Sequence, residues 1–569
     1  MGMRYFALAT DYDGTLARKG LVDETTIASL HKLRESGRIP ILVTGRQIED
    51  LLSVFPHPEI FDRIVAENGA LIYNPANRKL TVLGETPPDR LISLLRQKGV
   101  PLSIGRVILA TVTPHETTVL ESVRNLGLER PVIFNKGAVM VLPTGINKAS
   151  GLKKALAELG FSPHGVVGIG DAENDHAFLE FCECSVAVSN ALPALKERAD
   201  LVVKGSHGAG VAELIERLVA TDLTELESRL ERHSIPLGFR EDGSQISIKP
   251  YDSAILVAGT SGSGKSTLTT GFIERLKERK YQFCVIDPEG DYSNLDSVIL
   301  GDKDHAPSPS EVVSVLMDPN QNVVVNLTGM KREEHPTFFA ALLPHFQELR
   351  AKTGRPHWCF IDETHHLLPE SRDPSPLIPK SMNGVWLVTV HPDHVSQPVL
   401  QLVNMVVAIG SSPEDTIRSF SEKLGKGPPS MPQKELAAGE AIVWERQSGE
   451  QPFWIRSIPS KGERQRHRRK YAEGELPPDR SFYFRGPEGK LNLRAHNLQL
   501  FLQMADGVDD ETWVHHLSKG DYSGWFHTGI KDEDLAAAAS EVEKNRQLSP
   551  KESREQIRNL VEDRYTAPE

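Results

Sequence analysis

The sequence predicts an α/β protein with two doubly wound parallel-sheet domains and a small, mainly helical C-terminal module. Its 569 residues exceed the roughly 250–300 that a single hydrophobic core serves, so several domains are expected. Apolar runs such as YFALATDY and SAILVAG alternate with amphipathic segments, which is typical of parallel βα units. Beyond residue 478 the strand-like runs give way to helical periodicity, which predicts the third module.

Composition indicates a globular chain in a reducing compartment. Hydrophobic residues make up 39% and charged residues 25%, and no apolar run approaches the roughly 20 residues of a membrane helix. The N-terminus does not read as a signal peptide. The four cysteines are too few for a disulfide framework and are expected in the core. We therefore expect a cytoplasmic protein without membrane contact, and the net charge of −12 argues against a surface coated by nucleic acid.

A Rossmann-like domain is expected over residues 1–218. Its predicted strands are YFALATDY, RIPILVTGR, RIVAENGALIY, GVVGIGD, SVAVSN and ADLVVKG, with helices such as ETTIASLHKLRESG between them. The pattern breaks at about 82–143, where a helix, a strand, a second helix and a strand pair follow one another. This stretch predicts a small α+β cap inserted into the domain.

A polar connector at 219–234 leads into a second α/β domain, expected over residues 235–460. Its predicted strands include SAILVAG, FCVIDPEG, NVVVNL, HWCFIDE, GVWLVTVH and NMVVAIG, again in a doubly wound sheet. A basic, proline-containing linker follows at 461–478. The helical module is expected over 479–545, and the polar stretch 546–569 is expected to be a flexible tail.

Polar side chains follow the first two strands of the first domain. Asp11 and Asp13, in DYDGTLA, lie two residues apart at the carboxyl end of a parallel strand, where α/β sites form. One carboxylate can attack phosphorus to give an aspartyl-phosphate, while the other protonates the leaving oxygen. Thr44, in LVTGR, ends the next strand, and its hydroxyl can hold a phosphoryl oxygen.

Two further motifs follow the predicted cap. Lys148, in GINKASG, begins a helix, and its ammonium can neutralise a phosphoryl group and an attacking carboxylate. The run GIGDAENDHA ends a third apolar strand with Asp171, Asn174 and Asp175. Because a hard cation prefers oxygen ligands, this acidic turn beside Asp11 predicts a Mg²⁺ site.

These motifs, in this order, resemble those of the haloacid-dehalogenase superfamily over residues 3–215. The segment ENGA and the place of the insertion are similar to its Cof-type branch. The resemblance implies a phosphatase with Asp11 as nucleophile and Asp13 as general acid and base. It also implies metal and phosphate ligands at the same strand ends: Asp11, Asp171, the Asp13 carbonyl and Asp175 for Mg²⁺, and Thr44 and Lys148 for phosphate.

The cap, at about 60 residues, is similar to the small caps of phosphoglycolate and sucrose-phosphate phosphatases. This resemblance implies a small phosphorylated metabolite as substrate. Arg46 and Asn68 are candidates for the lining of its pocket. The alternative, a surface arginine and a turn asparagine, stays equally open.

The second domain carries a phosphate-binding loop, GTSGSGKST, between the strand AILVA and a helix. This is the context that a Walker A motif requires. Its glycines let backbone N–H groups face the phosphates of ATP, its lysine reaches the β and γ oxygens, and its serine can ligate Mg²⁺. The predicted nucleotide-binding residues are Gly259, Gly262, Gly264, Lys265, Ser266 and Thr267.

The run HWCFIDETHH places Asp362 and Glu363 at the end of another buried strand. Asp362 is expected to hold Mg²⁺ through water, and Glu363 to orient the water that attacks ATP. The structural alternative is a pair of helix-capping carboxylates.

The second domain resembles the HerA–FtsK class of hexameric P-loop ATPases over about 233–455. The segments IDPEGDY and VVAIGSSPEDTIRSF carry this resemblance beside the Walker motifs. It implies a homo-oligomeric ring with an arginine finger from a neighbour, for which Arg418 and Arg355 are candidates. The class often has glutamine at the γ-phosphate sensor, where this chain reads Thr389-Val390-His391.

Three hypotheses about the fusion follow. The first is a small-molecule phosphatase whose attached ATPase regulates or assembles it. The second is a nucleic-acid-processing ring whose phosphatase trims ends or nucleotides, with the basic residues of 461–470 contacting phosphates. The third is a signalling ATPase whose phosphatase domain senses a metabolite. The small cap favours the first, because it can close over a compact ester. Trp513, Trp525 and the pair His515–His516 are expected to be structural.

Overall fold

The computed structural model describes residues 3–135, 137–226, 230, 233–251, 253–372, 383–432, 434–461, 476, 478, 481–530 and 532–565. The chain divides into two compact units. One comprises Met1–Ser266 and Arg275–Ile458, and the other Thr267–Glu274 and Pro459–Glu569. The basic cluster at 461–470 lies, apart from its first residue, outside the described residues.

The first sheet of the larger unit contains eight strands in the order β12-β11-β10-β1-β2-β3-β4-β5 within the described residues. The strands from β12 to β3 are parallel, and β4 and β5 are antiparallel. The strands are β1 (Ala7–Asp11), β2 (Ile39–Val43), β3 (Arg63–Ala66), β4 (Leu71–Asn74), β5 (Lys79–Val82), β10 (Val166–Gly170), β11 (Cys184–Ala187) and β12 (Leu201–Val202).

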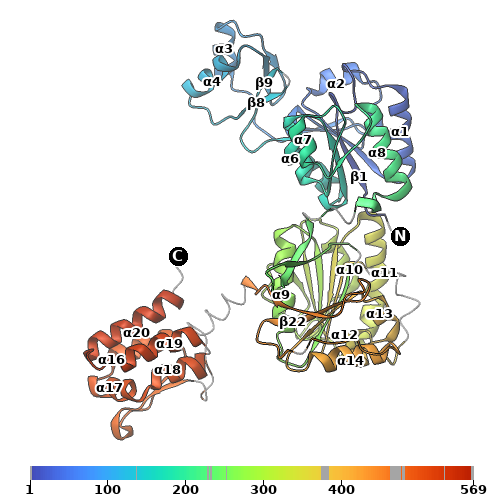
Figure 1. Ribbon diagram of the computed structural model, residues 1–569. Coiled ribbons are helices and arrows are strands. Elements are labelled where there is room, and N and C mark those ends of the chain that lie inside the picture. The colour runs from blue at the N-terminus through green and yellow to red at the C-terminus, as the bar shows by residue number, and fades with distance from the viewer. Residues whose placement is uncertain are drawn as a thin grey trace. The chain divides into compact units, whose positions relative to one another are not determined.

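Helices cover both faces of this sheet, with α1 and α8 on one side and α6 and α7 on the other (Figure 1). The sheet is therefore doubly wound, as the alternating pattern predicts. The helices are α1 (Glu24–Glu35), α2 (Ile48–Val54), α5 (Lys148–Leu159), α6 (His176–Phe181), α7 (Pro193–Arg198) and α8 (Gly208–Thr221).

Strand β1 lies between β10 and β2, and all three run in the same direction. Their register pairs Asp11 with Val43, and Thr10 with Ile169. The residues that follow these strands therefore meet at one edge of the sheet, at the point where the strand order reverses. All five residues of β1 are buried, which fixes the position of that edge in the core.

The insertion forms a separate small sheet with the order β6-β7-β9-β8 and its own apolar core. Leu91 and Leu95 of α3 pack there with Val119 and Val123 of α4. Spacings of four residues place each pair on one helix face. The elements are α3 (Asp89–Gln97), β6 (Ser103–Ile104), β7 (Leu109–Val112), α4 (Glu116–Asn125), β8 (Val132–Asn135) and β9 (Ala138–Val141).

In the part of the chain that the structure describes, the second sheet has eleven strands in the order β14-β13-β23-β22-β21-β15-β20-β19-β16-β18-β17. The part from β21 to β17 is parallel, as the sequence predicts, whereas β14, β13, β23 and β22 join it as antiparallel strands. The sheet is mixed because short connections link β13 to β14 and β22 to β23, and only antiparallel strands can be joined so closely.

The strands of this sheet are β13 (Ile235–Phe239), β14 (Gln245–Ile248), β15 (Ala254–Gly259), β16 (Phe283–Asp287), β17 (Val298–Leu300), β18 (Val323–Asn326), β19 (Trp358–Ile361), β20 (Val385–Thr389), β21 (Met405–Ile409), β22 (Glu440–Glu445) and β23 (Phe453–Ser457). The helices along this stretch of chain are α9 (Lys265–Glu278), α10 (Pro309–Leu316), α11 (His335–Thr353), α12 (Thr364–Leu367), α13 (Gln397–Leu402) and α14 (Pro413–Lys423).

The C-terminal module pairs a small hairpin with helices around an aromatic core. Trp513 is fully buried, stacks on Tyr522 at 4.4 Å between ring centroids, and donates its indole N–H to Ser553 at 2.9 Å. The elements are β24 (Phe482–Phe484), β25 (Leu493–Ala495), α16 (Leu498–Gly507), α17 (Asp510–Lys519), α18 (Asp521–Trp525), a π-helix (Phe526–Ile530), α19 (Glu533–Lys544) and α20 (Pro550–Tyr565).

Helix α20 corrects the expectation of a flexible tail at 546–569. Ile557 and Val561, one helical turn apart, are buried in the core of the module. Two apolar residues in a polar run give only a weak signal in the sequence, and the partner surface that orders them is made by other helices. His516, by contrast, is structural as expected, because its two ring nitrogens contact the Asp521 carboxylate and the Arg485 backbone N–H.

All four cysteines are buried, which confirms their expected place in the core. Among the described residues, no helix combines the length and the apolar character that crossing a bilayer requires.

A close backbone contact connects the 3₁₀ turn Glu67–Gly69 with the start of α5. Gly69 has a φ of 98°, and a Cβ atom on it would lie 1.9 Å from the carbonyl oxygen of Asn147. Only glycine allows this approach and this backbone conformation. Since Asn147 caps α5 through Ser150, the contact fixes the position of the helix start.

We expect Gly69→Ala to lower the free energy of unfolding by about 1–3 kcal/mol more than Gly99→Ala does. Gly99 is a matched control, because its φ of 72° carries the same backbone strain but nothing lies within 4 Å of its added Cβ. Urea unfolding followed by circular dichroism measures both. Equal losses in the two variants would show that the contact with Asn147 relaxes freely.

Candidate functional site

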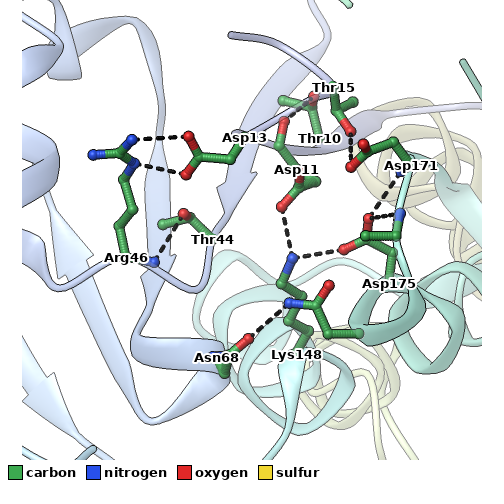
Figure 2. A network of polar contacts seen from close by, with 12 residues as sticks. Thr10, Asp11, Asp13, Thr15, Thr44, Arg46, Asn68, Lys148, Asp171 and Asp175 are labelled. Atoms are coloured by element: carbon green, nitrogen blue, oxygen red, sulfur yellow. Dashed lines mark hydrogen bonds and ion pairs between the residues drawn. The ribbon is translucent and has the colours of Figure 1, made fainter. Parts of the chain in front are cut away.

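A buried cation between two buried carboxylates forms the centre of the first candidate site (Figure 2). The Lys148 ammonium donates to Asp11 Oδ1 and to Asp175 Oδ1, both at 2.6 Å. Lys148 is 2% exposed, Asp11 4% and Asp175 fully buried. The sequence predicted all three residues for one site, and the structure places them in direct contact.

Burial and crowding set the charges of this centre. Burial, and then the neighbouring Asp175, raise the pKa of Asp11 to about 7, although the Lys148 ammonium opposes both effects. Burial alone would lower the pKa of Lys148, but the two carboxylates outweigh it and the pKa rises. Lys148 is therefore held as a cation at this edge of the sheet.

The third carboxylate of the centre is Asp171, which follows β10. Its backbone N–H donates to Asp175 Oδ2 at 2.9 Å, and Thr15 Oγ1 donates to Asp171 Oδ1 at 3.4 Å. One oxygen from each of Asp11, Asp171 and Asp175 lies within 4.8 Å of the others, and all three residues are buried. This all-oxygen, strongly acidic set fits a hard divalent cation such as Mg²⁺.

Asp13 lies beside this centre and pairs with Arg46. The guanidinium contacts both carboxylate oxygens, from Nε to Oδ2 at 2.6 Å and from Nη2 to Oδ1 at 2.8 Å (Figure 2). This two-pronged geometry fixes the orientation of the Asp13 carboxylate. The open question about Arg46 is thus partly answered, since its side chain contacts a predicted catalytic residue.

The other predicted residues of this site also lie at the same edge. Thr44 is 1% exposed, and its hydroxyl accepts the Arg46 backbone N–H at 3.1 Å. Asn68 is 1% exposed with a φ of 53°, and its side-chain oxygen accepts from Asn174 at 3.0 Å. Asn68 is therefore both a turn residue and a neighbour of the acidic loop that contains Asn174.

Sequence reasoning missed Glu67, which connects the domain to its cap. The fully buried carboxylate accepts three backbone N–H groups, from Arg106 at 3.0 Å, Val107 at 2.8 Å and Ile108 at 3.1 Å. These residues belong to the loop between β6 and β7 of the cap. A charged residue in a strand-like run, without a local partner, is the sequence signal that could have identified Glu67.

The second candidate site surrounds the glycine-rich loop between β15 and α9. Gly264 has a φ of 98° and precedes α9, of which Lys265, Ser266 and Thr267 form the first turn. The Lys265 ammonium folds back onto the loop and donates to the carbonyl oxygens of Gly259, at 3.0 Å, and Thr260, at 2.9 Å. Burial lowers its pKa, against the pull of Glu363 and Asp362.

Asp362 and Glu363 directly follow β19, as predicted. Asp362 is 4% exposed, and burial together with the adjacent Glu363 raises its pKa to about 8. Burial also raises the pKa of Glu363, which has a left-handed φ of 41°. A strained backbone at Glu363 and two carboxylates with raised pKa values, close enough to influence Lys265, are typical of a functional site.

Polar groups from the neighbouring strand ends complete this second site. The carboxylate of Asp287, the last residue of β16, accepts the backbone N–H groups of Gly290, Asp291 and Tyr292 and so shapes the IDPEGDY segment. Thr389 Oγ1, at the end of β20, lies 3.0 Å from His365 Nδ1. Thr389, at the position expected for the γ-phosphate sensor, therefore contacts the turn that carries Glu363.

Arg355 is not available as an arginine finger. It is 1% exposed, and its guanidinium donates to the carbonyl oxygens of Gly160, Leu316 and Met317. Burial lowers its pKa to about 10. Arg418 remains a candidate for the arginine finger. It lies on α14 with half of its side chain exposed, and its ion pair with Asp415 lies at the surface.

We expect Lys148→Met to lower the free energy of unfolding by about 3–5 kcal/mol, because it leaves two buried carboxylates without their cation. Adding Asp11→Asn should recover part of that loss, since it removes one of the two like charges. Urea unfolding without Mg²⁺ measures both variants. A double variant whose loss equals the sum of the single losses would contradict the buried triad.

Two segments of the chain match known protein families. Residues 8–106 and 119–215 match the family described as haloacid dehalogenase-like hydrolase, and residues 246–348 match the central domain of helicase HerA. A phosphoglycolate phosphatase of Methanothermobacter thermautotrophicus is 30% identical over 224 residues, which are 37% of this chain and 98% of that protein. Phosphoglycolate phosphatase 2 of Saccharolobus solfataricus is 29% identical and is covered to 95%, by 39% of this chain.

A haloacid dehalogenase-like hydrolase of Bacteroides thetaiotaomicron is 22% identical, with a TM-score of 0.34 and coverage of 38% of this chain and 99% of that one. The sequence match to the Methanothermobacter thermautotrophicus phosphatase covers almost all of that protein and establishes the family. The chain belongs to the haloacid dehalogenase-like hydrolases through its first 215 residues and joins this phosphatase-type enzyme to a HerA central domain.

Proposed function

We propose that the first domain is a Mg²⁺-dependent phosphomonoester hydrolase for a small phosphorylated metabolite, joined to a domain that binds and hydrolyses ATP. The contact of Lys148 with Asp11 and Asp175 carries this proposal. It combines a nucleophile, a permanent cation and a cation-binding acidic loop at the edge of the sheet where phosphate esters bind.

The proposed reaction has two displacement steps. In the first, an Asp11 carboxylate oxygen forms a bond to phosphorus, the ester P–O bond breaks, and Asp13 gives a proton to the leaving alkoxide. In the second, Asp13 takes a proton from water, the water oxygen attacks phosphorus, and the bond to Asp11 breaks. Inorganic phosphate and the original Asp11 carboxylate are restored.

The neighbouring residues have distinct tasks in this scheme. Lys148 neutralises the phosphoryl oxygens, and Thr44 donates its hydroxyl to one of them. Arg46 contacts both oxygens of Asp13 and so holds in place the carboxylate that exchanges protons in both steps. Asp11, Asp171 and the Asp13 carbonyl would hold Mg²⁺, with Asp175 in support, and the ion would supply charge stabilisation to the phosphoryl group.

In the second domain, the loop from Gly259 to Thr267 would bind the phosphates of ATP. Asp362 and Ser266 would hold its Mg²⁺, and Glu363 would orient the water that attacks the γ-phosphorus, so that the bond to ADP breaks. The resemblance to ring ATPases supports a homo-oligomer, with a hexamer as the proposed form. Thr389 and its neighbours lie where they can report on the γ-phosphate.

The substrate class follows from the cap and from the relatives. Several matched relatives are phosphoglycolate phosphatases, which supports phosphoglycolate or a small sugar phosphate as the ester. Three backbone N–H groups of the cap donate hydrogen bonds to the carboxylate of Glu67, which belongs to the same turn as Asn68. A small cap anchored this near the nucleophile favours a compact substrate.

A ring ATPase that acts on nucleic acid is the second candidate. The match of residues 246–348 to a helicase domain favours it. In this case the phosphatase would process ends or nucleotides, and DNA binding would weaken steeply with salt. Binding of labelled DNA at two salt concentrations, with and without the 461–470 cluster, separates the two candidates.

We expect Asp11→Asn to reduce phosphate release from a small ester by about 1,000-fold or more, because the nucleophile is lost, and to leave ATP hydrolysis intact. Lys265→Ala should have the opposite effect, because it removes the cation that reaches the β and γ oxygens. A phosphate-release assay with each substrate measures both. Loss of both activities in either variant would contradict two independent sites.

A panel of phosphomonoesters with Mg²⁺ should show release of phosphate that depends on Asp11, with phosphoglycolate or a small sugar phosphate as the preferred ester. The physical reason is the closeness of the cap to the nucleophile, which excludes bulky leaving groups. Preference for a nucleotide or a DNA end would instead support the second candidate. Addition of ATP to the same assay tests whether the two sites are coupled.

A further inference from the structure

Histidines crowd around Glu363 in the second domain, and the proposed chemistry does not use them. Helix α12 (Thr364–Leu367) places His365 and His366 directly after Glu363. The His366 backbone N–H donates to the Glu363 carbonyl at 2.8 Å, which folds the turn back on itself. As a result, a carboxylate oxygen of Glu363 and one nitrogen of each imidazole all lie within 4.8 Å of one another.

Within the described residues, one carboxylate oxygen of this group lacks a hydrogen-bond donor. Glu363 Oε2 is buried and has no hydrogen-bond partner among the described residues. It lies 3.4 Å from His365 Nδ1. Thr389 Oγ1 accepts the His391 N–H at 3.0 Å, so its own hydrogen can be donated to His365 Nδ1, and this nitrogen then has no proton to give to Glu363 Oε2. Two electron-rich atoms at this distance favour a cation between them.

We propose that Glu363, His365 and His366 form a binding site for a divalent transition-metal ion of the Zn²⁺ class, and that the bound ion inhibits ATP hydrolysis. The binding part stands on the side-chain cluster alone. The inhibitory part rests on the proposed role of Glu363 in orienting water.

The donor set selects the class of ion. Two imidazole nitrogens and one carboxylate suit Zn²⁺, Co²⁺ or Ni²⁺, whereas Mg²⁺ prefers oxygen ligands. Tetrahedral ligands at the usual Zn–N distance lie about 3.3 Å apart, so the three side chains need only small rotations from their present separation. The His391 ring lies 5.5 Å from that of His365 and is the nearest candidate for a fourth ligand.

Another histidine group of the larger unit shows why this one is different. His164 Nδ1 lies 2.8 Å from Glu183 Oε2, and His164 Nε2 lies 2.8 Å from the Arg279 carbonyl oxygen. Both nitrogens of that ring are engaged with acceptors, so no lone pair is available for a metal. The ring also stacks on Tyr281 at 3.7 Å between centroids, which indicates a structural role.

Metal binding at Glu363 would act directly on the ATP site. The same carboxylate cannot bind a transition metal and also polarise the attacking water. Asp362 and Lys265 would still hold nucleotide, so the expected effect is a slower turnover with little change in ATP binding. Such a site would tie the second domain to the availability of a metal other than Mg²⁺.

The test uses the full chain, freed of metals and kept in excess Mg²⁺ so that the carboxylate site around Asp11 holds the ion that it prefers. Co²⁺ serves as a visible probe, since its absorption reports nitrogen ligands and low coordination. We expect one Co²⁺ per chain, displaced by Zn²⁺. His366→Ala should weaken binding about tenfold or more, and His345→Ala, at an exposed position of α11, should not.

The same titration is then repeated on ATP hydrolysis. Inhibition by Zn²⁺ is expected at the concentration that fills the site, and His366→Ala should shift that concentration by the same factor. No visible Co²⁺ spectrum, or equal binding by wild type and His366→Ala, overturns the site. Binding without inhibition overturns only the inhibitory part. A chain without ATPase activity would still give the Co²⁺ result, so failure of the proposed function is distinguishable.

Discussion

The contact of the Lys148 ammonium with Asp11 and Asp175 is the interaction on which the first domain depends. Two carboxylates and one cation are withdrawn from water at the edge of a sheet, and each would be costly to bury alone. The ammonium also lies at the first residue of α5, where the helix dipole disfavours a positive charge. The carboxylates offset that cost, so the acidic loop, the nucleophile and the helix start hold one another in place.

Backbone contacts extend this arrangement outward. Gly69 lets the Glu67–Gly69 turn touch the carbonyl of Asn147, which caps the helix that begins with Lys148. The same turn provides Glu67, whose carboxylate binds three backbone N–H groups of the cap. One short, strained turn therefore connects the cap with the helix that begins at Lys148. Backbone strain of this kind often lies next to functional sites.

The second domain uses buried charge differently. Asp362, Glu363 and Lys265 are close enough to shift one another's pKa values, but no direct ion pair between them is present in the described residues. Lys265 instead donates to loop carbonyls, and the buried Glu363 Oε2 has no hydrogen-bond partner among the described residues. The first site is thus held together by its own charges, whereas the second is arranged around charges that a nucleotide, Mg²⁺ or another metal would bring.

The sequence by itself determined the chemistry and much of the fold. Motifs at strand ends predict Asp11, Thr44 and Asp171 for one site because parallel strands bring their carboxyl ends to one edge, whereas Lys148 is predicted at a helix start and Lys265 by the glycine-rich loop before its helix. Only the tertiary structure decided which long-range partners these residues meet. The pairing of Arg46 with Asp13, the anchoring of the cap by Glu67 and the burial of Arg355 against Gly160 join residues 33 to 195 positions apart. No local pattern encodes such contacts, since they depend on how separate elements pack. The same holds for α20, which is ordered by a surface that other helices build.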